Sequence, residues 1–482
     1  MAGPSDILER AAKARPDHPM LVCVGEKGEV TGRTYGQVAE RARRVAAGLA
    51  GRGIAAGDRV LLALENTTTF FECWFGVMRA GAAAVCVSPR LAPAEVSHVV
   101  RDARPRLALA QRAALYRIGD ALAPVGEVLA EDEHGRLDGS GPVPSPAPEA
   151  PALVLYTSGS TSRPKGVLIT GASLGFAAER MLESLPLTGD DRSLVALPVS
   201  HVNALAYSTM PAVGAGATIV AMDRFRASTW LDVAREHGAT VASLSMAALR
   251  ILLGRSPCGA DRSHRMRTIG CGARWREVEE RFGARTIGWY GMTETVIPPL
   301  VAPPDAPYGS CGRPTRGYEV RLDGDGRLFV RGRRGVELFA GYVGDPTDRV
   351  DADGWLETGD RLRSDEGGNH FFVSRDGDVL RVGGENVAAP EIERVLLSHP
   401  AVLEAAVVGG PDRALGEVPV AFVVVREGHS VQREELALLC GRELAPWKVP
   451  RRFELVAELP RVTLDKVDKK ALRSEVGWNE ID

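Results

Sequence analysis

The sequence predicts an α/β protein with more than one domain, and three observations lead to that prediction. A chain of 482 residues with 45% apolar side chains can bury a large core and exceeds a single domain. Strand-like apolar runs alternate with amphipathic helical runs over residues 34–253, which is typical of parallel sheets covered on both faces. From residue 379 onward the chain has a pattern of its own, which predicts a small α+β domain.

The elements of the first half follow from the spacing of apolar side chains. Residues Thr34–Gly51 repeat apolar side chains every three or four positions, which predicts a helix with Thr34 as its N-cap. The same reasoning predicts a strand, a helix, a strand and a helix in that order, at Asp58–Leu64, Thr67–Ala80, Ala82–Val87 and Pro93–Asp102.

The second half begins after the proline-rich residues 139–151, which we expect to be a surface connector. From about Tyr318 the apolar period shortens to two, which indicates an antiparallel or barrel-like piece. Between the proline-rich connector and Tyr318 we expect helices at Ser173–Ser184, Ser228–His237 and Ala247–Leu253. We expect strands at Ser193–Leu197, Ala217–Ala221 and Val241–Leu244. The C-terminal domain is expected to contain helices Pro390–Ser398 and Val431–Glu443 and strands Val402–Val408 and Val418–Val425.

Composition excludes several classes of protein. A net charge of −3 without a long basic run disfavours nucleic acid as a partner. No uncharged window of about 18 apolar residues exists, and Met1–Arg10 lacks the apolar core of a signal peptide. The seven cysteines are scattered without a C-x-x-C pair, so neither a disulfide framework nor a zinc site is expected. The sequence therefore predicts a soluble cytoplasmic protein with no membrane partner.

The stretch Leu153–Gly166, L-V-L-Y-T-S-G-S-T-S-R-P-K-G, predicts a buried strand that opens into a phosphate-binding loop. Glycine permits close backbone approach, and hydroxyls, N–H groups and the Lys165 ammonium suit phosphate oxygens. It is not the G-x-x-x-x-G-K-[ST] loop, because its lysine follows a proline and precedes no Ser or Thr. The alternative is a flexible surface turn, but such a run closing on P-K-G after a buried strand is rare.

Three further segments suit nucleotide chemistry. Gly288–Thr295, G-W-Y-G-M-T-E-T, joins an aromatic ring that can stack on a base to a Thr–Glu pair that can hold hydrated magnesium. Gly354–Asp360, G-W-L-E-T-G-D, ends in a carboxylate that can accept from both ribose hydroxyls, although an Asx-turn explains a lone aspartate equally well. Val382–Glu393, V-G-G-E-N-V-A-A-P-E-I-E, is a second glycine-rich loop before a helix.

Together with Leu459–Leu472, L-P-R-V-T-L-D-K-V-D-K-K-A-L, these segments resemble the acyl-adenylate-forming superfamily of CoA ligases, peptide-synthetase adenylation domains and luciferases. The resemblance covers nearly the whole chain and is strongest to the acyl-CoA ligase branch. It implies a large N-terminal domain of layered αβ sheets plus a small β-barrel at 1–374, a hinge at 375–378, and a small mobile α+β domain at 379–482. That domain would carry the catalytic lysine and swing between adenylating and thioester-forming poses.

The resemblance also implies a site for ATP and Mg²⁺, residue by residue. Ser158–Lys165 would hold the β- and γ-phosphates, Gly272 and Ala273 would flank the adenine with Tyr290, and Asp360 and Arg375 would hold the ribose. The implied nucleotide contacts are Thr157, Ser158, Gly159, Ser160, Thr161, Lys165, Gly272, Ala273, Tyr290, Gly291, Asp360 and Arg375. The implied catalytic residues are Thr293 at the α-phosphate, Glu294 as metal ligand, Lys466 between carboxylate and α-phosphate, and His201. Gly383, Gly384 and Glu385 would form the CoA loop.

The chain departs from the family pattern in three places. Gly377 stands where the hinge residue is usually Asp or Lys, and glycine widens the accessible φ and ψ. Arg321–Gly332 lacks the usual G-E-x-G-E element, which indicates a trimmed subdomain. Trp289 precedes Tyr290, where many relatives carry a small or aliphatic residue.

The implied acid pocket is small and contains polar groups. In the family the residue before that tyrosine lines the pocket, so Trp289 should disfavour long or flat aromatic acids. The gate segment L-P-V-S-H-V-N-A places His201 at the mouth and Asn203 inside, and Val202 is also expected to line the pocket. An Asn203 amide facing the pocket requires a polar ligand or small anion, whereas backbone capping of that amide is the alternative. The aspartate that holds the ammonium in amino-acid adenylation domains is missing, so an amino acid is not expected.

The resemblance implies an AMP-forming ligase that activates a small acid with release of pyrophosphate and passes it to CoA, in secondary metabolism. One alternative is adenylation of nitrite for N–N bond formation on an amine, without CoA; a carrier protein as acceptor also stays open. A non-catalytic nucleotide-binding relative is disfavoured, because Lys165, Glu294, Asp360 and Lys466 occur together. A small-molecule substrate and a monomer or homodimer are expected.

Overall fold

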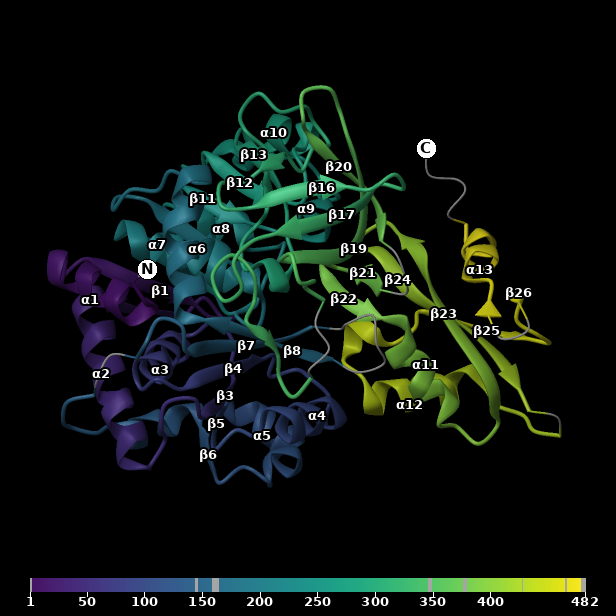
Figure 1. Ribbon diagram of the computed structural model, residues 1–482, viewed down its shortest axis with the longest axis horizontal. Coiled ribbons are helices and arrows are strands. Elements are labelled where there is room, and N and C mark those ends of the chain that lie inside the picture. The colour runs from purple at the N-terminus through teal and green to yellow at the C-terminus, as the bar shows by residue number, and fades with distance from the viewer. Residues whose placement is uncertain are drawn as a thin grey trace.

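The computed structural model confirms the predicted α/β class, with a large N-terminal and a small C-terminal domain (Figure 1). It describes residues 2–143, 146–157, 164–345, 349–375, 379–426, 428–463 and 466–477, and of residues 374, 375, 461–463, 466 and 470 it describes the backbone alone. Among these residues, no helix combines the length and the apolar character that a membrane crossing needs.

The first sheet of the N-terminal domain has seven strands and carries the predicted phosphate loop. Its strands are parallel except at the edge formed by β7, β8 and β18, where the pairing is antiparallel. In sheet order the strands are β18 (Gly341–Tyr342), β8 (Lys165–Thr170), β7 (Pro151–Thr157), β4 (Ala83–Val87), β3 (Arg59–Ala63), β5 (Leu107–Ala110) and β6 (Glu127–Ala130).

The second sheet has nine strands, with a parallel centre and antiparallel ends. Because both faces of its central strands are covered, these strands are continuous apolar runs rather than alternating ones. In sheet order they are β15 (Arg313–Pro314), β14 (Leu300–Val301), β13 (Arg285–Tyr290), β12 (Thr268–Cys271), β11 (Val241–Ser243), β9 (Arg192–Val195), β10 (Thr218–Met222), β1 (Pro19–Val24) and β2 (Val30–Thr34).

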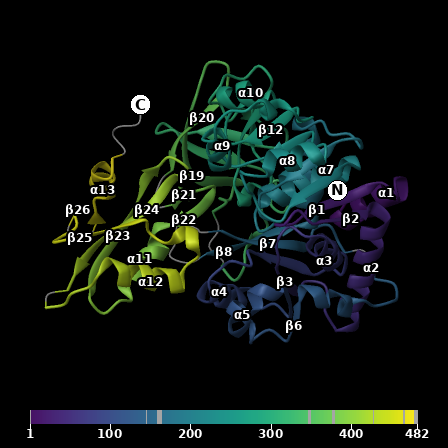
Figure 2. The ribbon, with the colours of Figure 1, turned by 180° about the vertical axis from the view of Figure 1, so that it is seen from behind.

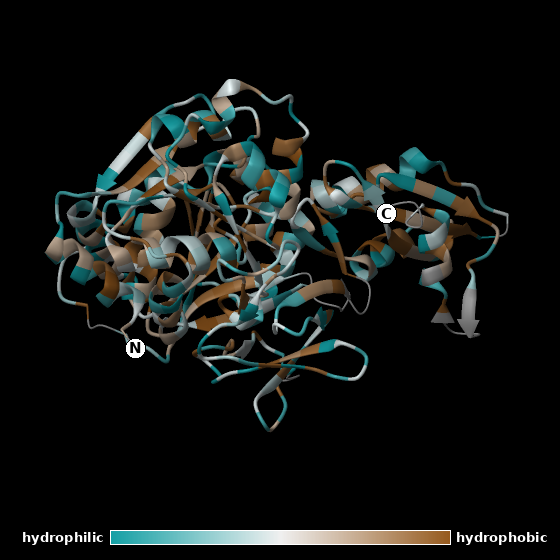
Figure 3. Ribbon diagram, turned by 90° about the horizontal axis from the view of Figure 1, so that it is seen from above, coloured by the Kyte–Doolittle hydropathy of each residue, from teal (hydrophilic) through white to brown (hydrophobic). Residues whose placement is uncertain are grey.

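The largest core cluster lies between the two sheets and around α2, α3 and α6, and the hydrophobic segments gather in this interior in Figure 3. Helices α4 and α5 cover the outer face of the first sheet, and α8, α9 and α10 that of the second. As predicted, Thr34 caps α2, in a reciprocal box with Gln37. The helices are α1 (Pro4–Ala14), α2 (Tyr35–Gly51), α3 (Thr68–Arg79), α4 (Pro93–Ala103), α5 (Arg112–Leu122), α6 (Gly171–Ser184), α7 (Met210–Ala215), α8 (Trp230–Glu236), α9 (Met246–Leu253) and α10 (Arg276–Phe282).

The segment with the two-residue period forms a four-stranded antiparallel sheet that precedes the C-terminal domain in the chain. Its strands are β16 (Glu319–Leu322), β17 (Arg327–Arg331), β19 (Trp355–Ser364) and β20 (His370–Arg375). Asp360 of β19 lies directly opposite Arg375 of β20, which brings the two predicted ribose-binding positions together across one strand pair.

The C-terminal domain builds its own sheet, with α11 and α12 packed on one face and α13 on the other. Its five strands are β22 (Glu385–Ala388), β21 (Val379–Val382), β24 (Gly416–Val425), β23 (Val402–Asp412) and β25 (Arg452–Val456). A separate pair consists of β26 (Arg461–Thr463) and β27 (Lys466–Val467), and the helices are α11 (Ala389–Leu397), α12 (Arg433–Glu443) and α13 (Lys469–Glu475).

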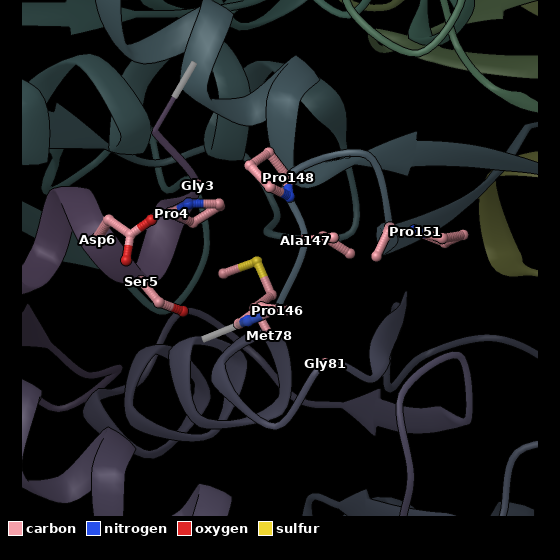
Figure 4. Close-up of a pocket in the computed structure, with 13 residues that line it drawn as sticks. Gly3, Pro4, Ser5, Asp6, Met78, Gly81, Pro146, Ala147, Pro148 and Pro151 are labelled. Carbon is pink, nitrogen blue, oxygen red and sulfur yellow. The ribbon is translucent and has the colours of Figure 1, made fainter. Parts of the chain in front are cut away.

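A small pocket opens beside the start of α1, against the end of α3 and the proline-rich connector (Figure 4). Ser5 and Pro148 line it, and it reaches the first residue of β7. The seven residues of β7 span about 20 Å, so the phosphate loop at its other end is remote from this pocket.

Candidate active site

The predicted site residues gather where parallel strands of both sheets end. The phosphate loop follows β7, the gate segment follows β9, Gly272 follows β12 and Gly291 follows β13. The carboxyl ends of parallel strands are where α/β proteins place ligands, because loops of different strands meet there. The C-terminal domain closes over the same edge through its β21–β22 hairpin.

The base of the phosphate loop is a strand pair. Thr157 at the end of β7 lies opposite Lys165 at the start of β8, while Ser158, Gly159, Ser160 and Thr161 lie outside the described residues. The Lys165 ammonium is 2.7 Å from the Asp345 carboxylate and 5.0 Å from the centre of the Tyr342 ring. The predicted phosphate-binding lysine is thus held in place by an acid and an aromatic face.

Glu294, the predicted metal ligand, is buried and oriented by an aromatic hydroxyl. Tyr342 donates to its Oε1 at 2.9 Å, and burial together with this carboxylate raises the pKa of Tyr342 well above its ordinary value. Among the described residues no group of three or more His, Cys, Asp or Glu could hold a metal. A single carboxylate nevertheless fits Mg²⁺, which keeps several waters and takes most other ligands from substrate phosphates.

The turn that contains Thr293 and Glu294 stores backbone strain. Thr293–Thr295 form one 3₁₀ turn, and the next residue, Val296, has φ of +59° although it is β-branched and fully buried. A β-branched side chain is disfavoured in that region, and such strain is found at functional sites that the surrounding structure holds rigid. Here Tyr318 donates to the Thr295 carbonyl at 2.5 Å and holds the turn.

The predicted adenine and ribose positions meet through one hydrogen bond. Tyr290 at the end of β13 donates to Oδ2 of Asp360 at 2.6 Å, and both side chains are buried. Gly272 and Ala273 follow the neighbouring strand β12, beside the end of β13. Tyr290, placed at the adenine by the resemblance, therefore also orients the carboxylate placed at the ribose.

The Trp289 ring lies on the face of the second sheet that carries the gate segment. It packs over Gly270 of β12, where any side chain would overlap the ring, and stands edge-on to Tyr207 at 5.8 Å between centroids. The opposite face of β13 is taken by Thr286, which bonds Glu279 of α10 at 2.6 Å. Only 5% of Trp289 is exposed, so the ring fills space that a smaller residue would leave open.

The gate segment continues into a π-helical turn, Asn203–Thr209, that spacing did not predict. Such turns are rare and occur mostly at functional sites. Among the residues that the structure describes, no backbone group caps the Asn203 side chain, and its Oδ1 accepts from the Ser243 hydroxyl of β11 at 2.6 Å. Val202 packs in the core, and buried Asn66 holds the segment by accepting from the Val199 N–H at 3.0 Å.

Sequence reasoning missed Tyr207, which lies between the gate and the nucleotide motif. Its hydroxyl lies 2.5 Å from where a Cβ on Gly291 would stand, and the side chain is 4% exposed. Burial raises the pKa of Tyr207. The charge of Arg381 opposes this and that of Glu294 adds a smaller increase, so the hydroxyl stays protonated. Tyr207 sits in an apolar run, N-A-L-A-Y-S-T, that resembles any core helix, so no local signal marks it.

The predicted CoA loop contacts the predicted mouth of the acid pocket, at His201. Glu385 Oε1 lies 2.9 Å from His201 Nε2, and the side chains are 25% and 39% exposed. Burial disfavours the imidazolium, but the Glu385 carboxylate more than offsets this and raises the pKa of His201. Gly384 has φ of +96° and lies against Ser245 of the N-terminal domain, where a Cβ would stand 2.7 Å from the serine Cβ. Gly383 also has positive φ, +62°.

Other predicted positions lie at the limits of the described residues. The backbone of Lys466 begins β27, on the side of the C-terminal domain that faces away from the N-terminal domain, where Figures 1 and 2 show its partner β26. The hinge residue Gly377 lies outside the described residues, and of Arg375 only the backbone is described.

Comparison with known proteins extends this picture. A model of the AMP-binding enzyme family matches residues 8–343, and one of the AMP-binding enzyme C-terminal domain matches residues 391–466. A crotonobetaine/carnitine–CoA ligase of Escherichia coli O139:H28 is 31% identical, across 94% of this chain and 95% of that protein.

Two solved structures are similar over both domains. An o-succinylbenzoate CoA synthetase double mutant from Bacillus subtilis, bound with its product analogue OSB-NCoA, has a TM-score of 0.86 and 27% identity, over 98% of each chain. The amide bond synthetase McbA from Marinactinospora thermotolerans has a TM-score of 0.84 and 26% identity, over 98% of this chain and 99% of that one.

Proposed function

The chain belongs to the AMP-binding enzymes of the acyl-adenylate-forming superfamily and is an AMP-forming ligase, and from this premise we propose that it activates a small, polar acid and passes it to CoA. In the first step a carboxylate oxygen of the acid attacks the α-phosphorus of ATP and displaces pyrophosphate. In the second step the CoA thiol displaces AMP from the acyl carbon. The single observation that carries the small size of the acid is the packing of Trp289 over Gly270 and against Tyr207.

We propose the predicted residues as the ATP site. Thr157 and Lys165 hold the two ends of the phosphate loop on paired strands, and Asp360 lies across from Arg375. Such positioned charges stabilise the negative charge that develops on the phosphate oxygens during in-line displacement. Mg²⁺ bound at Glu294 would neutralise phosphate charge, and Tyr342 holds that carboxylate in one orientation.

The acid would bind between the π-helical turn and β13. Trp289 limits its length, whereas Tyr207 and Asn203 place a hydroxyl and an amide beside it. Burying these polar groups against a purely apolar ligand would be costly, which favours an acid with polar atoms. The aromatic pair Trp289 and Tyr207 could also receive a quaternary ammonium through cation–π contact, as the crotonobetaine/carnitine relatives suggest.

The pose of the C-terminal domain supports CoA as acceptor. The hairpin that contains Gly383, Gly384 and Glu385 lies at the pocket mouth, whereas β27 with Lys466 faces away from it. The similar synthetase was solved bound with the product analogue OSB-NCoA, and its TM-score of 0.86 over 98% of the chain supports alike domain positions. We therefore propose that this is the thioester-forming pose, and that rotation at a hinge in 375–378, between domains 1–374 and 379–482, brings Lys466 in for adenylation.

The test is acid-dependent pyrophosphate release by the purified full chain, with and without CoA. We expect turnover with short polar acids, little with octanoate or benzoate, and a CoA thioester as product. Crotonobetaine, carnitine and nitrite belong in the same screen. Good turnover of benzoate would contradict the small pocket, and release with nitrite alone, independent of CoA, would replace the acid–CoA ligase by the nitrite alternative.

A further inference from the structure

Helix α4 carries three polar side chains on one stripe, beside an apolar face packed into the core. Glu95, His98 and Asp102 lie three and seven residues apart, so 3.6 residues per turn places them within about 60° of each other. The adjacent face of α4 packs valines and Ala103 onto the first sheet. With 11 residues the helix is about 16 Å long, and the packing of these apolar side chains holds it in place.

His98 and Asp102, toward the C-terminal end of α4, hold both ends of the predicted phosphate loop. Tyr156, just before the loop, donates to Asp102 Oδ2 at 2.5 Å, and His98 Nε2 donates to the carbonyl of Pro164, just after it, at 2.9 Å. The His98 and Tyr156 rings also contact edge to face, with 6.2 Å between centroids. The positions of Tyr156 and Pro164 therefore depend on α4.

Glu95, near the N-terminal end of α4, contacts the C-terminal domain. Lys448, in the turn Pro446–Lys448, lies 2.5 Å from Glu95 Oε1 and 3.0 Å from Glu391 of α11. All three side chains are at most 6% exposed. Burial opposes the charge on the ammonium, but the two carboxylates more than offset this and raise the pKa of Lys448. Figures 1 and 2 both show α4 between α12 and the β7–β8 hairpin.

Glu95 ties this interdomain contact to the first turn of α4 itself. Its second oxygen, Oε2, accepts from the Ala92 N–H at 2.8 Å and so caps the helix. Lys448 and Glu391 belong to the same domain, so a change of domain position separates Glu95 from both. That separation takes from Glu95 both its cation and the domain that covers it, so the carboxylate that caps the first turn of α4 exchanges an ammonium partner for solvent.

We propose that α4 couples the docking of the C-terminal domain to nucleotide binding: Lys448 holds Glu95, and His98 and Asp102 on the same stripe position the two ends of the phosphate loop. This inference rests on the proposed nucleotide role of residues 157–165. The three stripe residues are positioning residues, because they act through Tyr156 and Pro164 rather than on substrate. Linkage requires the effect to be reciprocal, so ATP must in turn change the docking equilibrium.

The test is a double-mutant cycle on ATP affinity, measured by calorimetric titration of the full chain. His98→Ala removes a neutral hydrogen bond and should weaken ATP binding by about 2- to 13-fold. His98→Gln keeps an N–H donor of similar reach and should restore most of that affinity. Lys448→Met should change the ATP affinity by about threefold or more. In the double variant, the change in affinity should differ by about threefold or more from the product of the two single changes.

The matched control is Arg101→Met, an exposed residue of α4 beside the stripe whose side chain makes no hydrogen bond or ion pair among the described residues, and its effect should multiply with that of Lys448→Met within about twofold. Glu95→Gln repeats the cycle with a side chain of the same shape, in case Lys448→Met does not fold. A wild-type chain that does not bind ATP would contradict the proposed function and this inference with it. A wild-type chain that binds ATP, with effects of Lys448→Met and His98→Ala that multiply, would overturn the coupling alone.

Discussion

The proposed acid pocket and the domain interface meet at His201, but they are held together by different interactions. The pocket is made by packing: Trp289 and Tyr207 are buried and locked against a glycine. The interface is made by charge: Lys448 with two carboxylates, and His201 with Glu385. The pocket excludes water because its rings fill the space. The interface holds the two domains together through ion pairs, which can break when the domains move.

The difference separates two kinds of consequence. Packed aromatic rings resist change, so substitutions in the pocket should cost folding stability and alter which acid fits. Ion pairs at the interface should instead alter the balance between domain positions. The partly exposed pair His201–Glu385 should have only a small effect on global stability, whereas breaking the buried contacts of Lys448 should also cost folding stability. Changes on one side should therefore leave the readout of the other side nearly unaffected, and five experiments test this.

The largest effect is expected from Trp289→Gly. Removing the ring leaves a cavity and should lower the free energy of unfolding by about 3–5 kcal/mol. The same cavity should admit octanoate or benzoate, which we expect the parent to reject. The measurements are thermal unfolding and pyrophosphate release across acids of increasing size.

Gly270→Ala is the matched control for the pocket, because the added methyl overlaps the Trp289 ring. Overpacking of this kind costs about 1–3 kcal/mol in the parent. In the Trp289→Gly background the methyl enters free space and should be tolerated. Equal costs of Gly270→Ala in both backgrounds would show that the ring points elsewhere.

Lys466→Ala tests the charged side. Removing a cation that stabilises the transition state typically costs about 10²–10³ in rate. We expect acid-dependent pyrophosphate release to be lost at this level, while a supplied acyl-adenylate is still consumed with CoA. Equal loss of both half-reactions would contradict the proposal that β27 turns toward the site only for adenylation.

Asp360→Ala lies between the two regions and should affect ATP rather than the acid. Two ribose hydroxyls would each lose a charged acceptor, at about 1.5–3 kcal/mol per bond. Calorimetry should show weaker ATP binding with unchanged acid preference. Tyr290→Phe is the control, because it removes the hydroxyl that orients Asp360 and should give a smaller change in the same direction. Unchanged ATP affinity in Asp360→Ala would contradict the ribose assignment.

Tyr207→Phe removes one hydroxyl from the pocket and leaves its shape unchanged. Loss of a neutral hydrogen bond to the acid should cost about 0.5–1.5 kcal/mol. We expect KM for the acid to rise by the corresponding factor, with ATP affinity unaltered. A changed ATP affinity with unchanged KM for the acid would place the hydroxyl at the nucleotide instead.

The contrast between packing and charge also explains what the sequence could predict. Helices, strands and motifs are local patterns, so the helix 35–51, the strand 83–87 and the ends of the phosphate loop were all predicted within a few residues. The pairing of Asp360 with Arg375 and the location of Trp289 needed the fold, because they depend on strand register.

The contacts that sequence reasoning missed join residues far apart in the chain. Lys448 and Glu95 are 353 residues apart, and nothing near either one distinguishes it from an exposed surface charge. Tyr342 and Glu294 are 48 residues apart, and the tyrosine lies in the short strand β18, in a stretch G-Y-V-G that matches none of the motifs above. Buried polar pairs of this kind become visible only when the surrounding apolar packing is known.

The smallest effect concerns His201 and Glu385, and its sign follows from their pKa values. The pKa of His201 is raised above its ordinary value of 6.5. The pair therefore stabilises the docked domain fully at pH values below 6.5, and this stabilisation is lost as the pH rises through the raised pKa. Burial disfavours the Glu385 carboxylate, but His201, Lys448 and Arg90 outweigh this and lower its pKa, so its contribution is present above the ordinary 4.5 and is lost only in more acidic solution.

Between those limits the pair should contribute about 0.2–1 kcal/mol, because both side chains are partly exposed to solvent. His201→Gln should therefore lower the unfolding midpoint more at about pH 6 than at about pH 8, when each is compared with the parent at the same pH. Glu385→Gln should give the same pH-dependent difference, and the double variant should add little to either, because one contact is lost in all three. A midpoint difference that stays constant across this range would mean that the imidazole contributes by packing, and the domain interface would then resemble the acid pocket at this point.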